Sequence, residues 1–237
     1  MTHILDSPVW AALTGPHAHL AEVNGQAARY HPDVAPFATL AADYDERAWA
    51  DLAALIGPGT EVVVAGVIST PPAGWDTVAQ IPGVQMVATN LRAAPDQEAV
   101  RLRAGNVPEM LDLVARTEPG PFKTRTIELG TYLGIRIGGK LVAMAGERLH
   151  PKGWTEISAV CTDPAYRGMG LASRLVRAVA AGIVARGETP FLHTSAANTR
   201  AIRLYLSLGF ALRQHTMFSA YRTPDPAPLL TDSAAAP

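Results

Sequence analysis

One stretch of this sequence, DPAYRGMGLASRL at residues 163–175, has the residue types of an anion-binding loop. It follows a predicted strand and leads into a predicted helix. Gly168 and Gly170 let a ligand approach the backbone, and the free N–H groups and dipole of a helix N-terminus attract negative charge. Arg167 precedes the glycines directly. The pattern therefore predicts a phosphate or pyrophosphate site.

Two common nucleotide-binding loops fit these residues poorly. A P-loop needs a lysine after its second conserved glycine, and none follows here. A dinucleotide loop needs a third glycine, where Ser173 stands, and an acidic residue at the end of the next strand. Glu188 has the right separation but precedes that strand. Coenzyme A is a third possible pyrophosphate-bearing ligand.

Two motifs resemble those of the GNAT superfamily of N-acetyltransferases. RGMGLA, residues 167–172, matches the Arg/Gln-x-x-Gly-x-Gly/Ala motif that holds the acyl-CoA pyrophosphate in that family. NTRAIRLYLSLGF, residues 198–210, resembles the family signature N-x-x-A-x-x-L-Y-x-x-x-G-F, and EISAVCTDPAY resembles its central strand. The resemblance covers about residues 98–222, with both motifs in the family order.

The resemblance implies a binding and catalytic role for each matched residue. Backbone contacts to the pantetheine arm are implied for Val160, Cys161 and Thr162. Pyrophosphate binding is implied for Arg167, Gly168, Met169, Gly170, Leu171 and Ala172. Asn198 would bond the pantetheine from the other side of a gap between strands, and Tyr205 would protonate the leaving thiolate. Tyr205 could alternatively be an ordinary core aromatic on the inner face of its helix.

The attacking amine must lose a proton, and Glu156 is the predicted general base. It lies four positions before Val160, so both side chains share a face of the strand if no bulge intervenes. The alternative is an exposed carboxylate at a strand end. Arg174 and Arg177 are expected on a solvated helix face, with the coenzyme 3′-phosphate as a possible contact for one of them. For His193, a place on the substrate side competes with that of a plain strand histidine.

The elements that position these residues follow the hydrophobic periodicity. Strand patterns are expected at residues 98–106, around a Gly138-Gly139 hairpin, at 154–164, 189–195 and 210–222. Helix patterns cover 107–117, 171–187 and 198–209. The resulting fold class is α/β of mixed α+β type, a GNAT-type, largely antiparallel twisted sheet flanked by helices.

The first part of the chain reads as a smaller α/β domain. It contains a hairpin pattern around Asn24-Gly25, a helix at 45–57 and a buried strand, TEVVVAGV, at 60–67. Either a degenerate copy of the second domain's fold or an unrelated small cap fits. Turn formers at 71–95 suggest a boundary, which gives domains at 1–94 and 95–222 and a disordered Pro/Ala-rich tail at 223–237. Glycine N-acyltransferase relatives and tandem GNAT proteins resemble this arrangement, which implies that the first domain walls the acceptor pocket.

Charge and composition limit the other possibilities. Residues 1–95 hold nine acids and three bases, and residues 96–237 hold twelve acids and seventeen bases. The bases are dispersed, so no nucleic-acid partner is expected, whereas the acidic first part favours a cationic amine. One cysteine excludes an internal disulfide and a cysteine-built zinc site, and no metal is expected. Without a signal peptide or a membrane-spanning stretch, a cytoplasmic monomer or homodimer is expected.

The combined prediction is an acyl-CoA-dependent N-acyltransferase. It would transfer acetyl from acetyl-CoA, used as a cosubstrate, to a small-molecule or peptide amine by direct attack in a ternary complex. The alternative is a non-catalytic acyl-CoA-binding or regulatory module, which would keep the glycine loop and lose the acid.

Overall fold

The computed structural model describes residues 3–65 and 70–225. Its first part contains two short 3₁₀ helices, two α-helices and five strands, in this order: η1 Ile4–Asp6, α1 Pro8–Leu13, η2 Ala18–Leu20, β1 Ala21–Asn24, β2 Ala27–Tyr30, β3 Phe37–Leu40, α2 Arg47–Ile56, β4 Glu61–Val64 and β5 Asp76–Ala88. The predicted hairpin, helix and buried strand are all present. Residues 66 and 67 of the predicted strand lie outside the described residues.

The second part follows the predicted order of elements. The bounds are β6 Val100–Leu102, η3 Ala104–Asn106, α3 Val107–Thr117, η4 Thr126–Leu129, β7 Tyr132–Ile137, β8 Lys140–Glu147, β9 Trp154–Thr162, η5 Pro164–Tyr166, α4 Leu171–Ala185, β10 Thr189–Ser195, α5 Thr199–Leu208 and β11 Phe210–Arg222. Gly138 and Gly139 both have positive φ angles, 58° and 80°, which a tight hairpin turn requires.

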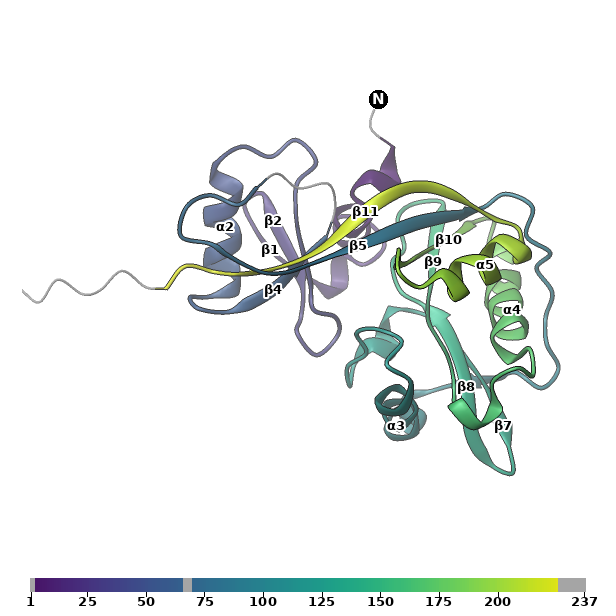
Figure 1. The fold of residues 1–237 in the computed structure, drawn as a ribbon. Helices are drawn as coiled ribbons and strands as arrows, with labels where there is room; N and C mark the ends of the chain where they lie inside the picture. Colours follow the sequence, from purple (N-terminus) through teal and green to yellow (C-terminus); the bar gives the residue numbers. More distant parts are fainter. Residues whose placement is uncertain (1–2, 66–69, 226–237) are drawn as a thin grey trace, which may run out of the picture.

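All eleven strands belong to one twisted sheet with the order β1-β2-β3-β4-β11-β5-β10-β9-β8-β7-β6. Most neighbours are antiparallel, and the parallel pairs are β3 with β4 and β9 with β10. Helices α3 and α4 pack on opposite faces of the strands β8 and β9 (Figure 1). The expected mixed, largely antiparallel sheet flanked by helices is confirmed.

Strand β5 corrects the expectation of a turn-rich segment at 71–95. It spans thirteen residues and lies between β10 and β11, although it precedes β6 in the chain. The turn formers inside it have other uses. The backbone of Pro82 faces the β10 side of β5, so its lack of an N–H removes no hydrogen bond to β11. At Gly83, a Cβ would collide with the Phe218 ring.

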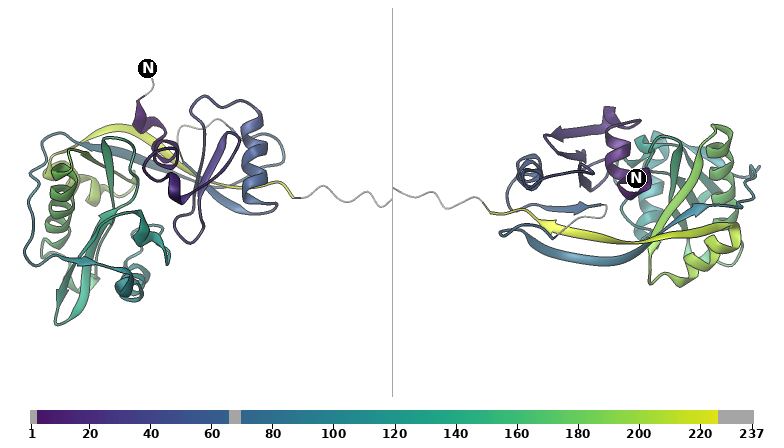
Figure 2. Two further views of the ribbon diagram at one scale, coloured as in Figure 1. Left: turned by 180° about the vertical axis from the view of Figure 1, so that it is seen from behind. Right: turned by 90° about the horizontal axis from the view of Figure 1, so that it is seen from above.

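The two long strands β5 and β11 connect the two parts of the molecule. β11 pairs with β5 along its whole length and with β4 through residues 219–222. Figures 1 and 2 show this pair running from the α2 region to the α5 region. One buried cluster also mixes both parts, with Leu5, Tyr30 and Phe37 packed near Leu149 and Phe191. The division at residue 94 stays a prediction, but the sheet runs across it without a break.

The start of the predicted tail is held in the fold. Thr223 is buried, and its hydroxyl accepts a hydrogen bond from the Thr60 N–H (2.9 Å) and donates one to the Gly57 carbonyl (2.6 Å). Residues 226–237 of the predicted tail lie outside the described residues. Within the part of the chain that the structure describes, no helix has the length and apolar character to cross a membrane.

Candidate active site

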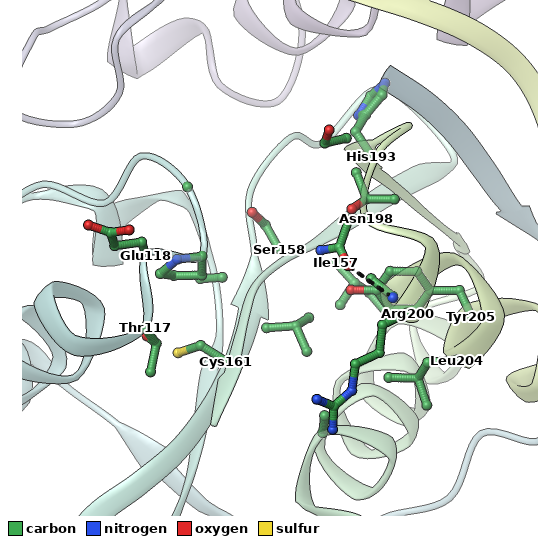
Figure 3. A pocket seen from close by; sticks show the side chains of 18 of the residues that line it. Thr117, Glu118, Ile157, Ser158, Cys161, His193, Asn198, Arg200, Leu204 and Tyr205 are labelled. Carbon is green, nitrogen blue, oxygen red and sulfur yellow. Dashed lines mark hydrogen bonds between the residues drawn. The ribbon is translucent and has the colours of Figure 1, made fainter. Parts of the chain in front are cut away.

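A cavity of about 990 Å³ opens where β9 and β10 separate. The two strands pair only through residues 154–156 and 189–191 and then diverge. Figure 3 shows Thr117, Glu118 and Cys161 on one side of this cavity and Asn198, Arg200 and Tyr205 on the other. The cavity therefore lies between the loop after α3 and the N-terminal part of α5.

A β-bulge in β9 accompanies the separation. Met144 and Gly146 of β8 pair with Cys161 and Ser158, so three steps along β9 match two along β8. Ala159 has φ 52°, an uncommon conformation for a residue with a Cβ, which is often found at functional sites. The bulge turns β9 away from β10 and exposes its end to the cavity.

Ten of the twelve predicted site residues line this one cavity: Val160, Cys161, Thr162, Arg167, Gly168, Gly170, Leu171, Ala172, Asn198 and Tyr205. Met169 is not among the lining residues, and its side chain is 56% exposed. Glu156 does not line the cavity either. The structure therefore brings together the residues that the two motifs select.

The glycine loop has the geometry of an anion cradle. Gly168 and Gly170 have φ angles of 85° and 73°, and a Cβ at either position would stand in open space. Gly170 is the N-cap of α4 and supplies no capping side chain. The N–H groups of the first turn of α4 have no carbonyl partner within the helix, so they are available to an anion.

The arginines near this loop differ in availability. Arg174 makes ion pairs with Asp96 (2.7 Å) and Glu98 (2.6 Å), and Arg177 donates to the Arg92 carbonyl. Arg200 lines the cavity, and its guanidinium makes no hydrogen bond or ion pair with any described residue. The sequence analysis did not identify Arg200 as a site residue. Its position two residues after Asn198, the N-cap of α5, could have indicated that it lies at the cavity.

Asn198 and Tyr205 come from α5. The Asn198 side-chain oxygen caps the helix by accepting from the Ala201 N–H (3.1 Å), which leaves its amide NH₂ for other partners. Tyr205 is 7% exposed, and burial raises the pKa of its phenol to about 12. No described residue hydrogen-bonds to its hydroxyl, which lies at the cavity wall.

Glu156 takes part in a buried ion pair. It does not share a face of β9 with Val160, as expected for a regular strand, because the bulge lies between the two residues. Its carboxylate accepts two hydrogen bonds from Arg148 (2.7 and 2.6 Å) and lies 2.6 Å from Nδ1 of His193. Burial alone would raise its pKa, but Arg148 and His193 outweigh this and lower the pKa to about 2. Val160 packs in the α4-side core with Ile157, on the face opposite Glu156.

His193 lines the cavity and has its tautomer fixed by its neighbours. Gln85 donates from Nε2 to the Leu5 carbonyl (2.8 Å) and accepts at Oε1 from Arg213 (2.8 Å), which orients its amide. The same Nε2 lies 3.0 Å from Nε2 of His193, so that ring nitrogen must accept. Nδ1 then carries the proton and donates to Glu156.

Cys161 points to the α3 side, in the core expected for it. Its thiol interacts with Thr117, and burial raises its pKa to about 11, so the thiol stays protonated near neutral pH. No group of three or more His, Cys, Asp or Glu residues in the described ranges could hold a metal ion.

The opposite wall of the cavity comes from segments far apart in the sequence, and sequence reasoning did not find its residues. Phe37 and Val63 come from the first part of the chain, Ala79 and Ile81 from β5, and Phe218 and Ala220 from β11. Glu118, which has φ 45°, is the carboxylate among the lining residues. This wall is otherwise mainly apolar.

Comparisons with known proteins agree with the fold. Residues 132–219 match the family model described as FR47-like protein. An 82-residue segment, 33% of this chain, is 40% identical to N-alpha-acetyltransferase RimI from Mycobacterium tuberculosis. That match spans 51%, about half, of the relative's length.

Two solved structures match almost the whole chain. A protein from Novosphingobium aromaticivorans, assigned to the GNAT family of acetyltransferases, is 41% identical, with a TM-score of 0.87 over 95% of this chain and 100% of that one. A GCN5-related N-acetyltransferase from Kribbella flavida shares the fold at 16% identity, with a TM-score of 0.62 over 95% and 98% of the two chains. This chain belongs to the GNAT family of acetyltransferases.

Proposed function

We propose that this protein is an acetyl-CoA-dependent N-acetyltransferase that transfers the acetyl group directly to a primary amine in a ternary complex. The observation that carries the proposal is the single cavity that joins the glycine loop, Asn198 and Tyr205 to an apolar wall on the opposite side. The partial match to a protein named N-alpha-acetyltransferase adds the α-amine of a polypeptide to the small amines as acceptor classes.

The residues present fit acetyl-CoA. The open space at Gly168 and Gly170 and the uncapped start of α4 suit a pyrophosphate. Arg200 offers a guanidinium for a phosphate group. When bound, acetyl-CoA supplies the acetyl group as a thioester.

Tyr205 is the proposed proton donor. A carbon–nitrogen bond forms and the carbon–sulfur bond breaks. The amine gives its proton to water in the cavity, the coenzyme sulfur gains one from Tyr205, and the phenolate recovers a proton from solvent. With a pKa of about 12, the phenol keeps its proton at neutral pH and can hand it to the thiolate.

Glu156 is better placed to position His193 than to touch the amine. It is fully buried behind Arg148, and its low pKa makes it a weak base. Its carboxylate fixes the Nδ1–H tautomer of His193, whose ring borders the cavity. The direct base role of Glu156 stays a prediction that the geometry does not favour.

The test combines acetyl-CoA calorimetry with free-thiol release across a panel of amines. Tyr205→Phe should lower kcat by about 100-fold and leave the acetyl-CoA Kd within about twofold. Tyr221→Phe removes a buried hydroxyl outside the cavity and should leave both unchanged. Full activity of Tyr205→Phe would remove Tyr205 as the acid.

Two outcomes separate the other possibilities. Acetyl-CoA binding without thiol release for any amine would favour the non-catalytic coenzyme-binding module. Absence of both binding and release would contradict the proposed function altogether.

A further inference from the structure

The outer half of β5 carries a free backbone edge beside the cavity. β10 pairs with β5 only over Gly83–Val87, and its next residue, Ala196, donates its N–H to the Pro82 carbonyl (2.8 Å). The chain then turns into α5. Among the described residues, 3–65 and 70–225, the stretch 76–82 of β5 pairs with β11 alone, and each of its residues is exposed.

The direction of the free edge follows from strand geometry. The Pro82 carbonyl faces the side where β10 ends, and alternate residues of a strand direct their N–H and C=O groups to the same edge. Gln80 therefore presents both its N–H and its C=O to the open side, whereas Ile81 and Ala79 pair with Phe218 and Ala220.

A bulge limits the length of this edge. Ala79 and Thr77 pair with the adjacent residues Ala220 and Tyr221, so Val78 is an extra residue that interrupts the regular ladder. Only Gln80, flanked by Ala79 and Ile81, can therefore exchange regular β-sheet hydrogen bonds with an added strand. This edge matches the length of a short chain end and not a long strand.

The edge lacks the charges that commonly protect such strands from pairing. Residues 77–81 are Thr, Val, Ala, Gln and Ile, and Val78 and Ile81 are 42% and 50% exposed. Ile81 and Ala79 line the cavity together with Phe218 and Ala220, their cross-strand partners. An uncharged, apolar strand edge that opens onto a cavity suits an extended peptide.

We propose that the acceptor is the N-terminus of an extended polypeptide that adds to the edge of β5 at Gln80. The inference rests on the proposed acetyl transfer and names its substrate class. The peptide continues the line of β10, antiparallel to β5, so that residue 1 lies opposite Ile81 and residue 2 opposite Gln80. The N–H and C=O of residue 2 exchange two hydrogen bonds with Gln80, and residues 1 and 3 face the apolar wall.

The test measures thiol release by the full chain with acetyl-CoA and alanine-based acceptors. The tetrapeptide amide should have a kcat/KM at least about tenfold above that of alaninamide, because only the peptide has a residue-2 carbonyl that accepts from the Gln80 N–H. N-methylation of residue 2 should lower the tetrapeptide's kcat/KM by about tenfold, whereas N-methylation of residue 3 should change it by less than about twofold.

A matched pair of protein variants tests the same contact. Gln80→Pro removes the free N–H and should lower the ratio of kcat/KM for the tetrapeptide to that for alaninamide by about tenfold. Gln80→Ala keeps the backbone N–H and should keep that ratio within about twofold of the original. Thermal melts check that both variants fold. If Gln80→Pro does not fold, the N-methylation series decides alone.

Three outcomes would overturn the inference. The first is equal kcat/KM for alaninamide and the tetrapeptide, and the second is indifference to N-methylation at residue 2. The third is a dimer in sedimentation that Gln80→Pro dissociates, because the edge would then bind a second copy of the chain. Thiol release with small amines alone would overturn the peptide inference and leave the proposed function intact, whereas no release and no acetyl-CoA binding would contradict the proposed function itself.

Discussion

The coenzyme side and the acceptor side of the cavity are built in different ways. On the coenzyme side, the backbone of one continuous loop and the start of one helix supply most of the surface, and glycines keep that surface open. On the acceptor side, single side chains from β3, β4, β5 and β11 meet because the sheet brings them together. A site built from the backbone of one loop produces a recognisable local sequence motif. A wall built from side chains of several strands does not, because its residues are far apart in the sequence.

The largest effect is expected from removing the first part of the chain. A fragment of residues 95–225 lacks β5, so β10 and β11 lose their shared neighbour, and we expect no cooperative thermal unfolding by circular dichroism. A fragment of residues 70–225 keeps β5 and should retain acetyl-CoA binding while losing Phe37 and Val63 from the acceptor wall. A folded 95–225 fragment with unchanged acceptor kinetics would show that the two sides are independent.

The next largest effect concerns the buried charge pair between the two sides. Glu156→Gln leaves the largely buried Arg148 without its carboxylate and should cost up to about 3–5 kcal/mol of unfolding free energy, measured by urea denaturation. Adding Arg148→Met should recover most of that loss. The folded pKa of about 2 lies below the ordinary value of 4.5, so this stabilisation is present above pH 4.5 and disappears as the pH falls toward 2.

The double variant also separates the two roles of Glu156. If Glu156 positions His193, kcat should fall by about tenfold and KM little. Loss of about 100-fold or more, together with loss of the acidic limb of the pH–rate profile, would instead support Glu156 as the base.

A third effect should be confined to the coenzyme side. Gly168→Ala forces a Cβ into the cradle at φ 85° and should weaken acetyl-CoA binding by about tenfold in calorimetry, since a left-handed residue costs about 1–2 kcal/mol. Gly138→Ala is the matched control, because it has φ 58° and equally open surroundings in a hairpin away from the cavity. Equal acetyl-CoA affinity in both variants would argue against the cradle.

The smallest effect is expected at Arg200. Arg200→Gln should raise the acetyl-CoA Kd by about threefold to tenfold at low salt and less at high salt, because an exposed charge is screened. Arg174→Gln should leave the affinity unchanged, since Arg174 is already paired with Asp96 and Glu98. An effect at Arg174 instead of Arg200 would reverse this assignment.

The same contrast explains what the sequence could and could not predict. Periodicity predicted α3, α4, α5 and the strands β7–β11, and the two motifs together with the central-strand resemblance identified ten residues of one cavity. The sequence analysis did not predict β5 because Pro82 and Gly83 are typical turn residues. In the structure, the proline lies at a free strand edge and the glycine packs against Phe218. Glu156 was placed on the wrong face because Ala159 gives no sign of a bulge.

The position of β5 has a consequence for how the protein is made. On the ribosome, β5 emerges well before β10 and β11, the two strands that flank it, so its hydrogen-bonding groups must wait until β11 has been made. Pairing between segments so distant in the chain is slow to form. A chain released early would leave β4 and β5 without β11 and expose strand edges to aggregation. The sheet can therefore be completed only after β11, Phe210–Arg222, has left the ribosome.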